Sequence, residues 1–276
     1  MTTSSSSNHQ VGRRYLWRIV FGAAVMYVVL QGGLTLLTGR IDQTLAAIAV
    51  AAAMMVVAFL IERWSFGRDI PHAFVALGLS RPRRAAMAVS LAIIVVMAAF
   101  FPVYSLATGV PIELRPDWLW VLLGAIALNG VAEETLFRGF VFGHLRQAGQ
   151  SFWRAGLISL VIFGLVHLYL FVQNPPLVAT LALIVAVAAA FPLAFLYERA
   201  GNVIWAGVVL HVGTHFFRLV DIPDAQYMSV AVTWLVLQIG LPFLVFAFAT
   251  NVLKTHETGT QPAQLEGALP RGAAGQ

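Results

Sequence analysis

Residues Thr44–Ile61 read TLAAIAVAAAMMVVAFLI, an apolar stretch without one charged side chain. A helix of about 20 such residues crosses the hydrocarbon core of a bilayer, because that core is about 30 Å thick and each residue rises 1.5 Å. This stretch therefore predicts a transmembrane helix, and comparable stretches recur on both sides of it.

The composition of the whole chain agrees with this interpretation. Of its 276 residues, 59% are hydrophobic and 11% charged, against roughly 45–50% and about 25% in soluble domains. Further apolar segments lie at roughly 19–37, 85–106, 155–172, 177–197 and 227–250, with two that contain polar residues at 117–142 and 202–219. The sequence thus predicts an all-α integral membrane protein with about eight transmembrane helices and its functional core on the fourth, fifth and seventh.

The two ends of the chain differ from the middle. Residues 1–14 are rich in Ser and Thr and residues 254–276 in Gly, Pro and Gln, so we expect a disordered tail at each end and a single transmembrane domain over 15–253. The chain has no cysteine, which excludes Cys nucleophiles and Cys-ligated metals.

The basic residues predict the orientation. Arg40, Arg115 and Arg218 lie on the side opposite the termini, and Arg138 lies inside a span. The other basic residues fall on the side of the termini: Arg13, Arg14, Arg18, Arg63, Arg68, Arg81, Arg83, Arg84, Arg146, Arg154, Arg199, Lys254 and Arg271. The positive-inside rule then gives a multi-pass protein of the cell membrane with both termini cytoplasmic. The net charge of +5 indicates membrane lipids as contacts, not nucleic acid. Arg218, near a span end, can snorkel to the interface and needs no functional role.

Few ionisable residues lie inside the spans: Glu133, Glu134, Arg138, His167, His211 and His215. Each charge at mid-helix costs roughly 2.5–3.5 kcal/mol on insertion scales. Glu134 and Arg138 are four residues apart and can form an ion pair on one helix face. Glu133 points about 100° away and has no such partner.

The depths of these residues coincide. Counted from the cytoplasmic ends of their helices, Glu133, His167, His211 and His215 all lie roughly 14–20 Å into the membrane. His211 and His215, again four residues apart, share one face. Three helices therefore deliver ionisable side chains to one layer, which predicts a functional site.

The same residues resemble a known family. VAEETLFRGF at Val131–Phe140 is similar to the EExxxR signature of the CAAX protease and bacteriocin-processing (CPBP, formerly Abi) family of intramembrane endopeptidases. FGLVH at Phe163–His167 resembles its FxxxH motif, and HVGTH at His211–His215 stands where HxxxN is expected. Leu77-Gly78-Leu79 before a basic cluster also resembles the family. The resemblance covers roughly residues 117–219.

The resemblance implies roles for these residues. Glu133 is the expected general base that activates a water, and His167 helps to hold that water. His211 and His215 are expected to stabilise the tetrahedral oxyanion.

The remaining motif residues are expected to support the site. Glu134 and Arg138 hold the base, and Phe163 belongs to the second motif. The implied substrates are peptide bonds of membrane-associated, C-terminally anchored or lipidated proteins. No cofactor is expected.

One residue departs from the family pattern and keeps alternatives open. His215 stands where the family has Asn, and histidine also binds zinc, so Glu133, His167, His211 and His215 are candidate ligands of a zinc-dependent variant. A proton-coupled transporter or a non-catalytic membrane binding protein is the alternative from another class. HExxH, a membrane-interior aspartate pair and GxSG are absent from the sequence. The sequence does not indicate the oligomeric state.

Overall fold

The structure is a computed structural model that describes residues 5–252, with side chains over 14–248. Seven helical stretches in this range are long and apolar enough to cross a membrane. They are Arg14–Leu37, Gln43–Ser65, Arg84–Thr108, Trp118–Gln147, Phe152–Gln173, Pro176–Arg199 and Asp224–Phe248, and a shorter apolar helix spans Trp205–Thr214. The prediction of an all-α membrane protein with about eight helices is confirmed.

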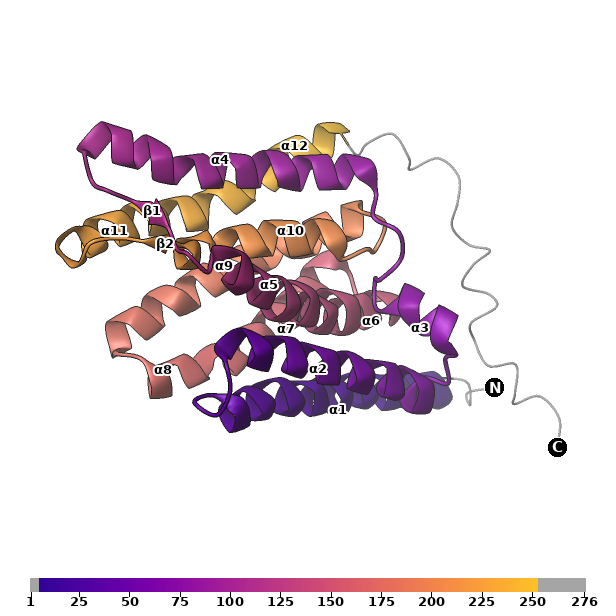
Figure 1. Ribbon diagram of the computed structural model, residues 1–276. Coiled ribbons are helices and arrows are strands. Elements are labelled where there is room, and N and C mark those ends of the chain that lie inside the picture. Colours follow the sequence, from indigo (N-terminus) through magenta and orange to yellow (C-terminus); the bar gives the residue numbers. More distant parts are fainter. Residues whose placement is uncertain (1–4, 253–276) are drawn as a thin grey trace.

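The first half of the chain supplies three long helices and a short one (Figure 1). These are α1 (Ser5–Leu37), α2 (Gln43–Ser65), α3 (Ile70–Ala76) and α4 (Arg84–Thr108). The fourth span is continuous but not uniform, with α5 (Trp118–Ala125), the π-helices η1 (Ile126–Ala132) and η2 (Thr135–Phe142), and α6 (Gly143–Gln147).

The second half completes the bundle. The fifth span is α7 (Phe152–Val166), the 3₁₀ turn η3 (His167–Tyr169) and α8 (Leu170–Gln173), and α9 (Pro176–Arg199) returns beside it. The rest is α10 (Trp205–Thr214), η4 (Phe216–Leu219), α11 (Asp224–Gly240), η5 (Leu241–Phe243) and α12 (Leu244–Val252). The strands β1 (Glu113–Leu114) and β2 (Val220–Asp221) pair antiparallel, Glu113 opposite Asp221.

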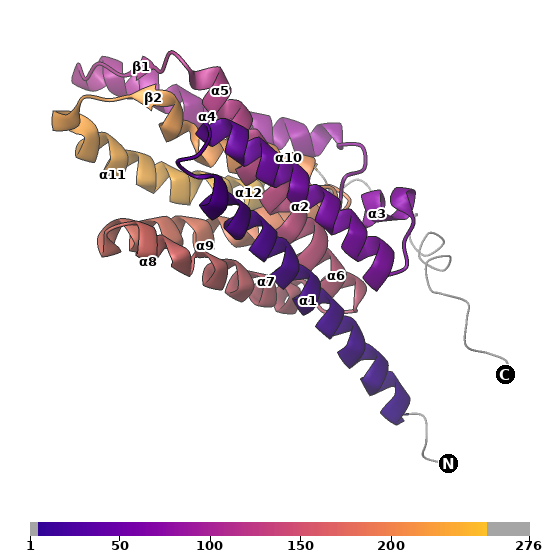
Figure 2. The same cartoon turned by 60° about the horizontal axis from the view of Figure 1, so that its bottom comes forward.

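Two expected boundaries differ from the structure. Helix α1 begins at Ser5, inside the segment 1–14 that was expected to be a disordered tail. The first turns of α1 extend beyond the other helices of the bundle (Figure 2) and continue its regular hydrogen bonding. The expected tail at 254–276 lies outside the described residues. The seventh helix ends at Thr214, not near 219, because the chain turns there to pair β2 with β1.

The two ends of the bundle carry different elements. The helix α3 lies at one end, and β1, β2 and α8 lie at the other (Figure 1). At the second end Asp42 caps α2 by accepting hydrogen bonds from the Thr44 and Leu45 N–H groups and from the Trp120 indole. The Leu45 N–H and the indole lower the pKa of the Asp42 carboxyl, so the cap is charged at neutral pH and is lost only as the pH falls through that lowered pKa.

The segment with Leu77 and Gly78 packs directly on the fourth span. Gly78 has φ +73°, a conformation that favours glycine, and its carbonyl accepts a hydrogen bond from the Ile204 N–H at 2.9 Å. A Cβ on Gly139 would collide with the Leu77 backbone. Gly139 therefore lets this segment seat on the helix that carries Glu133.

Candidate active site

The fourth span presents Glu133 and Glu134 between two π-helical segments, η1 and η2. A π-helix bonds i to i+5, and short π segments within α-helices are frequent at functional sites. The apolar pattern does not reveal this change of hydrogen-bond register. The angle of about 100° between the two glutamates, which assumes a regular α-helix, therefore does not describe this span.

Glu134 is the centre of a buried charge cluster. Its Oε1 accepts hydrogen bonds from Arg138 Nη1 at 2.9 Å and from His211 Nδ1 at 2.8 Å. The side chains of Glu134 and Arg138 are 0% and 3% exposed. The predicted ion pair is thus present, and it also orients a histidine from α10. The Arg138 guanidinium lies 5.0 Å from the centre of the Phe163 ring, a cation–π contact.

Glu133 has a partner that the sequence analysis missed. Its Oε1 accepts a hydrogen bond from Asn129 Nδ2 at 2.8 Å, so the carboxyl has a neutral hydrogen-bond partner on its own helix, although not a charged one. Asn129 is a neutral residue four positions earlier on the same helix, so the positions of the ionisable residues do not indicate it. The other oxygen, Oε2, lies 3.9 Å from His211 Nε2, too far for a direct hydrogen bond.

His167 is held from its own helix. Its Nδ1 donates to the Phe163 carbonyl oxygen at 2.7 Å, and because a carbonyl only accepts, the neutral ring keeps Nε2 as an acceptor. The ring centres of His167 and Phe163 lie 4.3 Å apart, and the Phe163 ring packs edge-on against Phe137. Phe163 thus fixes both the ring orientation and the tautomer of His167.

His215 follows the last residue of α10. Its ring lies 5.4 Å from that of His211, and its Nε2 is buried without a hydrogen-bond partner. The turn is braced by Thr214, whose hydroxyl donates to the His211 carbonyl and whose carbonyl accepts from Gln238 Nε2. Gln238, on α11, is a second supporting residue that the sequence did not single out.

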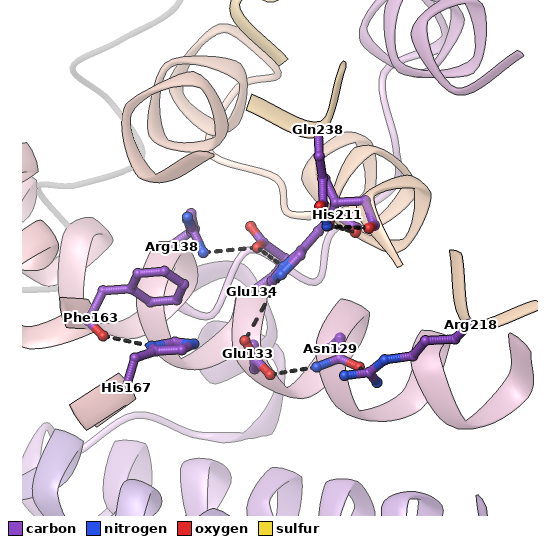
Figure 3. Close-up of polar contacts among 10 residues, drawn as sticks. Asn129, Glu133, Glu134, Arg138, Phe163, His167, His211, Arg218 and Gln238 are labelled. Atoms are coloured by element: carbon purple, nitrogen blue, oxygen red, sulfur yellow. Dashed lines mark hydrogen bonds and ion pairs between the residues drawn. The ribbon is translucent and has the colours of Figure 1, made fainter. Parts of the chain in front are cut away.

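The structure brings most of the predicted residues together (Figure 3). Glu133, Glu134 and His211 are neighbours, and Arg138 joins them through Glu134. Among the described residues, no hydrogen bond links His167 or His215 to Glu133.

The four candidate zinc ligands do not form a metal site in this arrangement. Within residues 5–252, no three His, Asp or Glu side chains are grouped closely enough to hold a metal ion. One feature of metal sites is nevertheless present, since a carboxylate orients His211 through Nδ1. The same pairing also serves histidines that act on substrates directly.

Carboxylates of the fourth span and a histidine of α10 thus gather inside a bundle whose helices are long and apolar enough to cross a membrane. Residues 115–217 match the model of the family described as type II CAAX prenyl endopeptidase Rce1-like. The "Putative membrane peptidase YdiL" of Bacillus subtilis (strain 168) is 33% identical over 128 residues, which are 46% of this chain and 47% of that protein. The chain thus aligns with about half the length of this curated relative. No solved structure gives a significant match.

These matches confirm the resemblance to the CPBP intramembrane proteases. All three motifs, from Glu133 to His215, fall inside the matched residues. The protein is a multi-pass membrane protein.

Proposed function

We propose that this protein is an intramembrane endopeptidase in which Glu133 activates a water molecule. The observation that carries the proposal is the pair formed by Glu133 Oε2 and His211 Nε2, which face each other across 3.9 Å. One water molecule can hydrogen-bond to both atoms at such a separation. Glu133 takes a proton of the water as it attacks the peptide carbonyl, without a covalent intermediate, and returns that proton to the amine that leaves when the C–N bond breaks.

His211 serves as the donor to the oxyanion. Its Nδ1–H is committed to Glu134, so Nε2 is the atom directed at the reacting group. A protonated ring carries a second N–H on Nε2, and the charge of Glu134 stabilises that imidazolium. Arg138 balances the charge of Glu134 on its other side, which offsets part of the cost of burying that carboxylate.

His167 and His215 complete the proposed site. The acceptor Nε2 of His167 can hold the attacking water, because its Nδ1 is occupied by Phe163. The unpartnered Nε2 of His215 can donate to the oxyanion beside His211. Donors of this kind contribute roughly 3–4 kcal/mol each to the stability of the transition state.

The proposed substrates are peptide bonds of membrane-associated proteins, including C-terminally anchored or lipidated ones. The matching family model has the description CAAX prenyl endopeptidase, which supports this class of substrates. The apolar spans place the protein among membrane lipids.

The proposal is tested by cleavage of membrane-associated peptides by the purified protein in vesicles. Glu133→Gln keeps the shape of the side chain but removes the base, so we expect the rate to fall by about 10²–10⁴-fold. Glu198→Gln, which changes a half-exposed glutamate paired with Arg146 away from the site, is the matched control and should keep the activity. Equal rates for the wild type and Glu133→Gln would refute the proposal.

We also propose that the protein lies in the cell membrane with both termini cytoplasmic. The exposed residues Gln147 and Ala225 lie at opposite ends of the bundle, and the chain has no native cysteine. Gln147→Cys should react with a membrane-impermeant thiol reagent only from the cytoplasmic side, and Ala225→Cys only from outside. The reverse labelling pattern would invert the orientation.

A further inference from the structure

The surroundings of Glu133 differ between the two ends of the bundle. Every residue from Ala132 to Leu145, towards the end that carries α3, is buried. Towards the end that carries β1 and β2, Asn129, His167 and His215 are partly exposed and Arg218 is exposed. The site is therefore less buried on the side of β1 and β2 than on the side of α3.

Arg218 lies on this side and turns towards the site. It belongs to η4, directly before β2, and its Nη1 donates to Asn129 Oδ1 at 3.4 Å (Figure 3). Asn129 in turn donates to Glu133 Oε1 at 2.8 Å. A residue that only snorkels to the membrane interface would not extend towards Asn129, so the interpretation of Arg218 from the sequence is incomplete.

No carboxylate of the described residues forms an ion pair with Arg218. Arg68, Arg115, Arg138 and Arg146 each lie within 2.6–2.9 Å of a Glu or Asp oxygen. No ion pair among the described residues involves Arg218, and its hydrogen bond to Asn129 is long. The planar guanidinium thus keeps N–H donors for an anion on the accessible side of the site.

We propose that Arg218 binds a carboxylate of the peptide substrate and thereby selects bonds close to an anionic group. The inference rests on the proposed endopeptidase function. A guanidinium holds a carboxylate with two parallel hydrogen bonds, and the carboxylate is either the C-terminus of the peptide or an acidic side chain near the scissile bond. A peptide group is favoured over a lipid phosphate because Arg218 reaches inward to Asn129, the partner of the base. Asn129 is then a positioning residue that links substrate binding to Glu133.

Binding to the Glu133→Gln variant tests the inference without any need for cleavage. The probes are fluorescent apolar peptides in detergent micelles, made with a free C-terminal carboxylate or as the C-terminal amide. A second pair, both amidated, differs by Glu or Gln near the C-terminus. We expect an anionic peptide of at least one pair to bind about 10-fold or more tightly than its neutral twin. The pair that shows the preference identifies the source of the carboxylate.

The added change Arg218→Gln should abolish this preference, and Arg218→Lys should keep part of it. Arg40→Gln, which changes an exposed arginine at the same end of the bundle, should leave the preference intact. Equal binding of both twins in both pairs would overturn the inference. The inference would also be overturned if Arg218→Gln weakened the binding of charged and neutral peptides equally. The same holds if Arg218→Gln changed only the affinity for vesicles with anionic lipids. A protein that binds with this preference but cleaves nothing would overturn the proposed activity and leave the carboxylate site standing.

Discussion

Glu134→Gln and Arg138→Gln are expected to lower the yield of folded protein in detergent sharply. Each substitution leaves a charged partner in a site where the two side chains are 0% and 3% exposed. Breaking a buried ion pair by removing one member costs roughly 3–5 kcal/mol. Glu134→Gln also weakens the acceptor of His211. The measurement is the monodisperse fraction after purification, with the thermal unfolding midpoint in the same detergent.

Glu133→Gln is the matched control for this prediction. The adjacent carboxyl becomes an amide whose oxygen still accepts from Asn129, and a costly charge leaves the bundle. Its yield should stay close to that of the wild type. The double variant Glu134→Gln/Arg138→Met removes both charges and should recover part of the loss. Equal yields for Glu133→Gln, Glu134→Gln and Arg138→Gln would contradict the assignment of Glu134 and Arg138 to structural support.

Substitutions of His215 are expected to separate two chemistries. Asn donates a hydrogen bond through its amide, as an oxyanion donor must, so His215→Asn should keep most of the peptidase rate. Ala cannot donate, and His215→Ala should lose on the order of 10²–10³-fold. His215 Nε2 has no hydrogen-bond partner among the described residues, so neither variant removes the partner of a neighbouring group there, and the folded yields should be similar.

If His215→Asn loses its activity, the zinc content of the protein shows the reason. If His215 is a zinc ligand, Asn is a poor replacement for imidazole, and zinc and activity should fall together in His215→Asn. Elemental analysis of the wild type and both variants gives this result directly. Stoichiometric zinc that is lost in His215→Asn along with activity would contradict the proposed role as a donor.

Much of the architecture and part of the site follow from local rules. Lengths of apolar sequence set the spans because the bilayer fixes the length of a helix that crosses it. The Glu134–Arg138 pair follows from its spacing of four residues. The meeting of Glu133 with His211 follows from their similar depth on neighbouring spans, since α10 packs against η1.

The remaining features depend on contacts that composition and spacing do not encode. The π-helical register around Glu133 leaves the apolar pattern unchanged. Asn129 is uncharged, so the cost of burying charge gives no signal for it. Arg218 has a long side chain at the end of a span. The sequence alone does not show whether such a side chain contacts lipid or protein. The early end of α10 reflects the pairing of β2 with β1, strands of two residues each.

A single turnover in heavy-oxygen water, with the enzyme in excess over peptide, tests most directly whether Glu133 activates water without a covalent intermediate. If a water activated by Glu133 attacks the carbonyl, the new carboxyl group of the amino-terminal product carries one heavy oxygen in the first turnover. A nucleophilic Glu133 can instead pass one of its own light oxygens to the product and retain the heavy one itself. A first-turnover product without heavy oxygen, together with heavy oxygen in Glu133, would contradict the mechanism.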